Sequence, residues 1–67
     1  MKGTIINIRN CGSLFVFTCI DENRDIFNIN LDWRNARDIL ESEGDIISRE
    51  IDYDDNSKII RFLEIKQ

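Results

Sequence analysis

The sequence predicts an all-β fold, a five-stranded antiparallel barrel with one short helix between its third and fourth strands. Five short segments are rich in β-branched and aromatic residues, and turn-forming residues separate them. One segment between the third and fourth strands has helical periodicity instead. The chain has 67 residues, of which 42% are hydrophobic and 33% charged. That composition predicts a single domain, residues 1–67, with a small core.

Three strands are predicted in the first half of the chain, over residues 4–9, 14–20 and 26–31. The first is the β-branched stretch TIINIR, and the turn signal Asn10-Cys11-Gly12-Ser13 follows it. A polar, acidic loop over residues 21–25 connects the second strand to the third.

A helix is predicted over residues 33–40. Asp32 is a suitable N-cap, Trp33, Ala36 and Leu40 share one face, and Gly44 follows the helix end. Trp33 is expected to plug one end of the barrel. Two further strands, over residues 46–53 and 58–65, are joined by the turn sequence Asp54-Asp55-Asn56-Ser57.

Five short strands in so small a chain bury one face of each strand most simply by closing into a barrel. A helix between strands three and four, placed over one end of that barrel, is the arrangement of an OB-fold. An SH3-like barrel also has five strands and is the structural alternative. Its strand lengths and loops fit this helix position less well.

Charge is distributed unevenly along the chain. Residues 1–37 hold five basic and four acidic residues, whereas residues 38–67 hold four basic and nine acidic ones, which together give the net charge of −4. A net acidic chain argues against tight, sequence-independent nucleic-acid binding, because that mode depends on neutralising phosphates. The acidic C-terminal half indicates a basic protein partner as a second possibility.

Several classes of function are not expected from the residue types. The chain has no histidine and only Cys11 and Cys19, so one chain cannot supply a four-ligand zinc site, and we expect no metal, cofactor or disulfide. No catalytic motif accompanies the carboxylates, so an enzyme is not expected. No apolar run is long enough to span a membrane and no signal peptide is visible, which predicts a cytoplasmic protein without membrane contact.

Four stretches of the chain are similar to the bacterial cold-shock domain, in which K-G-x-V-K-W-F-N, K-G-F-G-F-I, D-G-x-D-V-F-V-H and G-Q-x-V-x-F follow one another. The corresponding stretches here are Lys2-Gly3-Thr4-Ile5, Ser13-Leu14-Phe15-Val16-Phe17-Thr18, Asp25-Ile26-Phe27-Asn28-Ile29 and Gly44-Asp45-Ile46-Ile47. The resemblance extends over nearly the whole chain at low identity. It implies a single-stranded RNA- or DNA-binding module on an OB-fold.

The resemblance implies that Phe15, Phe17 and Phe27 stack on bases. Arg9, Arg24 and Lys58 are then candidates for phosphate contacts. The family's tryptophan and histidine positions hold Asn7 and Ile29, its lysine is Ser13, and two of its glycines are Leu14 and Val16. Each aromatic platform contributes roughly 1–3 kcal/mol per base, so the loss of two predicts weak binding.

Strand alternation leaves the facing of these phenylalanines open. In residues 27–31 the apolar side chains alternate with asparagines, which predicts Phe27 inside and Asn28 and Asn30 in water. The cold-shock geometry instead turns Phe27 outward. For residues 14–20 both faces are apolar, and the family geometry favours Phe15 and Phe17 outward. Two hypotheses result: a single-strand binding module with an aromatic sheet face, and an acidic protein-interaction or inhibitory module on the same barrel.

Overall fold

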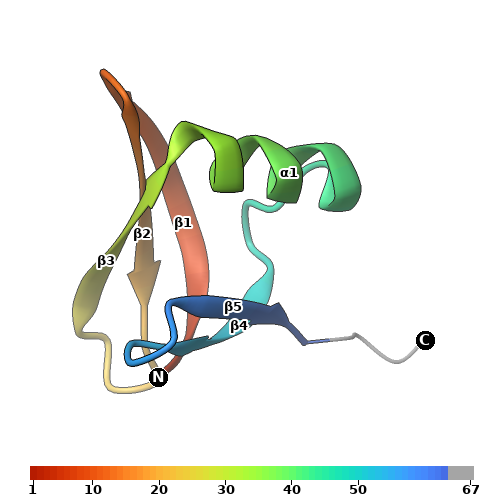
Figure 1. The fold of residues 1–67 in the computed structure, drawn as a ribbon. Coiled ribbons are helices and arrows are strands. Elements are labelled where there is room, and N and C mark those ends of the chain that lie inside the picture. Colours follow the sequence, from red (N-terminus) through yellow and green to blue (C-terminus); the bar gives the residue numbers. More distant parts are fainter. Residues whose placement is uncertain (64–67) are drawn as a thin grey trace.

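The computed structural model describes residues 1–63, in which five strands and one helix form a single curved sheet with the helix across one end (Figure 1). The elements are β1 (Lys2–Cys11), β2 (Leu14–Ile20), β3 (Ile26–Asp32), α1 (Trp33–Glu43), β4 (Glu50–Asp54) and β5 (Ile59–Phe62). All neighbouring strands pair antiparallel, as predicted. Within these residues no helix has the length and apolarity needed to cross a bilayer.

The sheet is open, and the prediction of a closed barrel is wrong in this respect. The strand order is β3-β2-β1-β4-β5, so closure requires that β3 pair with β5. Within residues 1–63 no Cα atom of β3 lies within 8 Å of one of β5. The strands β4 and β5 are only five and four residues long. Such short strands do not extend the sheet as far as β3, and within residues 1–63 both outer strands keep a free edge.

One β-bulge bends β1 and changes which side chains face the core. The β1–β2 register shifts between Ile5 and Asn7, so Ile6 is the extra residue. Before the bulge Ile5 is fully buried, and after it Ile8 packs against the core while Asn7 is exposed. The bulge lets a ten-residue strand bury apolar side chains on the concave face along its length.

The core lies between the concave face of the sheet and α1. Its buried members come from every strand but β5, from α1 and from the loop before β4: Ile5, Phe17, Cys19, Ile29, Leu31, Ala36, Ile46, Ile51 and Tyr53. The side chains of Ile60 and Phe62 extend it from β5. Among the described residues no buried polar side chain lacks a hydrogen-bond partner. The fold is therefore held together by apolar packing on one face of one sheet.

The helix begins and ends at the predicted caps but is three residues longer than predicted. The Asp32 carboxylate accepts a hydrogen bond from the Asn35 N–H at 2.8 Å, and Gly44, with a φ of 75°, donates its N–H to the Leu40 carbonyl. Trp33 is not the plug that the sequence predicted, because 46% of its surface is exposed and the Arg37 guanidinium covers its ring. Ala36 is the buried residue of this helix instead.

The segment after the helix is a loop rather than the start of a strand. A strand was expected over residues 46–53, but Ser48 has a φ of 74°, which interrupts extended structure there, and β4 begins at Glu50. Ile46 is nevertheless fully buried. Arg49 fixes the end of the loop, since its guanidinium lies 3.3 Å from the Glu43 carboxylate and over the Phe62 ring.

The β4–β5 hairpin turns where the sequence predicted. The Asp54 carboxylate accepts hydrogen bonds from the N–H groups of Asn56 and Ser57, and the Lys58 N–H donates to the Asp54 carbonyl at 2.7 Å. The last strand is shorter than the expected range 58–65, because β5 spans Ile59–Phe62. Residues 64 and 65 of that expected range lie outside the described part of the chain.

Candidate functional site

The three phenylalanines proposed as stacking residues face the core. Phe17 is fully buried, and Phe15 and Phe27 are partly buried and pack against the core cluster. The expected outward facing of Phe15 and Phe17 is therefore wrong. The alternation argument for β3 is confirmed, since Phe27 lies inside while Asn28 and Asn30 are exposed. No bulge is present in the β2–β3 register to reverse that facing.

The outer face of β1, β2 and β3 is polar in its middle. Cross-strand partners form two rows, one of Asn7, Thr18 and Asn28 and one of Arg9, Val16 and Asn30. The Thr18 hydroxyl lies 3.0 Å from the Asn28 amide oxygen and donates to it. These two rows hold no carboxylate and one cation. They can form hydrogen bonds with a ligand, but they provide no aromatic surface for a base.

The three cations proposed as phosphate contacts lie on different parts of the fold. Arg9 belongs to the outer face of β1, and Arg24 lies in the β2–β3 loop with a φ of 67°. Lys58 follows the β4–β5 turn and pairs with the Asp55 carboxylate at 3.4 Å. No shared basic patch is formed by these three residues, and whether any of them contacts a phosphate stays a prediction.

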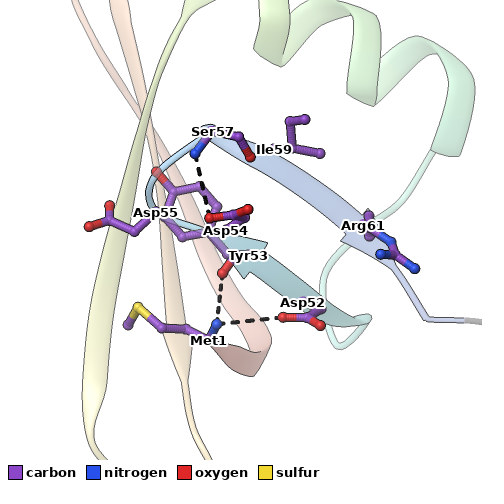
Figure 2. A pocket seen from close by; sticks show the side chains of 8 residues that line it. All are labelled: Met1, Asp52, Tyr53, Asp54, Asp55, Ser57, Ile59 and Arg61. Carbon is purple, nitrogen blue, oxygen red and sulfur yellow. Dashed lines mark hydrogen bonds and ion pairs between the residues drawn. The ribbon is translucent and has the colours of Figure 1, made fainter.

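A pocket of about 480 Å³ lies on the β4–β5 hairpin (Figure 2). We call it the hairpin pocket, and its lining residues are Met1, Asp52, Tyr53, Asp54, Asp55, Ser57, Ile59 and Arg61. Side chains on one strand alternate between its two faces, so Asp52 and Asp54 of β4 point away from the core while Tyr53 is buried. Three carboxylates thus lie beside the exposed apolar side chains of Met1 and Ile59.

The carboxylates of the hairpin pocket differ in how far they are already engaged. Asp54 is held by the turn, and hydrogen bonds from Ser57 and Asn56 lower the pKa of its carboxyl below the usual value of 3.8. Asp52 faces the amine of Met1 at 3.5 Å, and that amine also donates to the Tyr53 carbonyl at 2.7 Å (Figure 2). Among residues 1–63, Asp55 pairs with the exposed Lys58 side chain. Both ion pairs are solvent-exposed, and Arg61 lies opposite Asp52 in the β4–β5 register, so a cationic ligand would compete with cations of the chain for these carboxylates.

The two cysteines differ in environment and do not form a metal site. Cys11 is exposed at the β1–β2 turn, whereas Cys19 is buried, and burial raises the pKa of its thiol from 9.0 to about 11. Cys19 is held as a neutral thiol by this shift. Within residues 1–63 no group of three or more metal-ligating side chains comes together.

Sequence reasoning identified the acidic half of the chain but not the hairpin pocket. The signal was present in the alternation of Glu50, Asp52 and Asp54 with the apolar residues Ile51 and Tyr53. That pattern places Glu50, Asp52 and Asp54 on one face of a strand, and the last two of these line the pocket. The apolar side of the pocket was not foreseeable in the same way, because the pairing of β1 with β4 brings Met1 beside Tyr53 at the hairpin.

The fold and the hairpin pocket define a small, open β-sheet domain with a mixed acidic and apolar surface site. No family model matches the chain, and neither the curated proteins nor the solved structures contain a significant match to it.

Proposed function

We propose that this domain is a protein-interaction module that binds a basic partner segment at the hairpin pocket. The observation that carries the proposal is the combination, within one pocket, of three carboxylates with the exposed apolar side chains of Met1 and Ile59. Lysine and arginine side chains have an apolar stem and a cationic head. The stem can lie on Ile59 or on Met1 while the head reaches Asp52 or Asp55.

Charge and core packing both favour this function over base stacking. The chain carries a net charge of −4, which attracts a cationic segment and repels a phosphate backbone. The inward-facing rings of Phe15, Phe17 and Phe27 are engaged in the core. Exposing them to bind bases requires loss of that packing. The proposal is for binding, and it requires no catalytic group.

An NMR titration of the full chain with an octa-arginine peptide tests this proposal. We expect amide shift changes concentrated in residues 52–61. A variant with Asp52→Asn and Asp55→Asn removes two carboxylates without touching the Asp54 turn, and binding should weaken roughly 5- to 30-fold, by about 0.5–1 kcal/mol per exposed pair. The matched control Asp25→Asn with Glu41→Gln removes the same charge at two exposed residues that do not line the hairpin pocket. Equal weakening by both variants would show a nonspecific charge effect and reject the site.

A second candidate function is weak binding of single-stranded nucleic acid on the outer face of β1–β3. It is favoured by the two carboxylate-free rows that carry Arg9, Asn7, Asn28 and Asn30, and by the resemblance to the cold-shock domain. Amide and guanidinium groups can form hydrogen bonds with base edges and phosphates. Titration with oligo-dT and oligo-U at low and moderate salt tests it. Shift changes at Asn7, Arg9 and Asn28 would support this function, and their absence at low salt would reject it.

A further inference from the structure

The free edge of β3 is long, regular and uncharged over most of its length. β3 spans seven residues, its register with β2 is continuous, and only the final Asp32 carries a charge. Proteins usually protect such an edge with a charged side chain, a proline, a bulge or a short strand. By contrast, the other outer strand, β5, has four residues and carries Arg61. Figure 1 shows β3 at the margin of the curved sheet, with α1 leading away from its end.

The hydrogen-bond pattern shows which backbone groups of β3 point to the free edge. The Asp21 N–H donates to the Asp25 carbonyl, and the Trp33 N–H donates to the Ser13 carbonyl. The two pairs continue the β2–β3 register by one step at either end, and bonded pairs alternate with non-bonded pairs in an antiparallel ladder. The odd-numbered residues of β3 therefore bond to β2. The N–H and C=O groups of Ile26, Asn28 and Asn30 point away from it.

The sequence of β3 is complementary to itself in antiparallel orientation. The segment Phe27-Asn28-Ile29-Asn30-Leu31 reads apolar, Asn, Ile, Asn, apolar in both directions. If two copies pair about a two-fold axis at Ile29, Asn28 of one copy lies opposite Asn30 of the other. The same register places Phe27 opposite Leu31 on the core side. It also uses the even-numbered residues that carry the free backbone groups.

We propose that two copies of this chain form a symmetric dimer by pairing their β3 edges about Ile29. The pairing continues each five-stranded sheet into the other, with asparagines matched on the outer face and apolar side chains matched on the inner face. Residues 26–31 carry no charge, so the two edges can approach without like-charge repulsion although each chain has a net charge of −4. Such an isologous contact closes after two copies.

Concentration-dependent hydrogen exchange tests the contact at the atoms that define it. In the dimer the N–H groups of Asn28 and Asn30 become protected, and dilution should expose them. The N–H groups of Phe27 and Ile29 already bond to β2 and serve as the internal reference. Sedimentation equilibrium of the wild type should show a dimer at protein concentrations up to roughly 1 mM, the weak end of ordinary affinities. A wild type that stays monomeric there overturns the proposal and leaves the edge to a strand from another protein.

Charged variants at the two exposed asparagines provide a matched test of the register. The variant with Asn28→Lys and Asn30→Lys places lysine opposite lysine twice, which should weaken the dimer roughly 2- to 30-fold. The variant with Asn28→Lys and Asn30→Glu places lysine opposite glutamate and should dimerise at least as well as the wild type. Both lose the same Asn28 contact to Thr18, so they are matched in that respect.

Mixing provides the final control. A chain with Asn28→Glu and Asn30→Glu should form a heterodimer with the doubly lysine-substituted chain more tightly than either associates with itself. Both positions are exposed, so each variant should fold as the wild type does. Circular dichroism of each variant verifies this. Equal dimerisation of all these variants, or no preference for the mixed pair, would show that the contact lies elsewhere and would overturn the proposal.

Discussion

The ring of Phe27 lies directly against the backbone of Gly3. A Cβ atom on Gly3 would be 2.8 Å from Cε1 of Phe27 and 2.9 Å from the carbonyl oxygen of Ile20. Real Cβ contacts are not found at such distances, so Gly3 permits the close approach of β3 and the end of β2 to β1. The inward-facing ring of Phe27 fills the space above Gly3.

Substitution of Gly3 by alanine should therefore destabilise the domain. We expect a loss of about 1–3 kcal/mol in the free energy of unfolding, measured by urea denaturation, because the added methyl group overfills a packed site. The double variant with Phe27→Leu should recover part of the loss, which a double-mutant cycle would report as a coupling between the two positions. Ile20 limits the recovery because its carbonyl is backbone. A fully tolerated Gly3→Ala would contradict the observed packing.

Phe17 should behave as a core residue and not as a binding residue. Its side chain is fully buried, and Phe17→Ala should cost about 3–5 kcal/mol of folding free energy, a large part of the stability of a domain this small. The matched control is Asn30→Ala on the exposed outer face, which should change the free energy of unfolding little. Thermal denaturation of both variants distinguishes a buried Phe17 ring from one that faces outward. A folded Phe17→Ala protein of normal stability would support an outward ring.

The facing of the phenylalanines was predictable from the sequence in β3 but not in β2. In β3 the asparagines mark one face as solvent-exposed, so alternation alone gives the facing of Phe27. In β2 both faces are apolar, Leu14 and Val16 on one side and Phe15 and Phe17 on the other. The local pattern does not determine which face of such a strand is buried. Packing against β1, β3 and α1 determines it.

Barrel closure is likewise a long-range property. The turn at Asp54 was predictable because its side chain bonds to nearby backbone groups. Whether β5 reaches β3 depends on strand lengths and on the loop containing Ser48, whose positive φ carries no clear sequence signal. The hairpin pocket was missed for a related reason, because it requires the pairing of β1 with β4 that brings Met1 beside Tyr53.

Asp32 should stabilise α1 as its N-cap. Its carboxylate accepts a hydrogen bond from the Asn35 N–H, so Asp32→Ala should lower the free energy of unfolding by about 1 kcal/mol, within a range of 0.5–2 kcal/mol. Asp32→Asn keeps the acceptor and should retain most of the stability. Urea denaturation of the three proteins tests this. Equal losses for alanine and asparagine would indicate that charge, not capping, is responsible.

The two cysteines should differ sharply in reactivity. Cys11 is exposed and Cys19 is buried, so iodoacetamide at about pH 8 should modify one thiol of the folded chain. Mass spectrometry of the digested protein should locate the label on Cys11, and Cys11→Ser should abolish the fast reaction. Cys19 should react only when urea unfolds the chain. Rapid modification of Cys19 under native conditions would show that the core opens readily.

The buried thiol also predicts how stability changes at alkaline pH. Burial raises the pKa of Cys19 from 9.0 to about 11 in the folded state, so the folded chain holds this proton more tightly than the unfolded chain does. Below pH 9 the thiol is neutral in both states, and its contribution to stability is fully present. As the pH rises from 9 towards 11, the unfolded state ionises first and the free energy of unfolding falls.

In a Cys19→Ala variant, which has no thiol at this position, that part of the pH dependence should be absent, although the smaller side chain lowers stability at every pH. Urea denaturation of both proteins across this range measures the difference in slope, and parallel curves would contradict the assignment of the alkaline loss to Cys19.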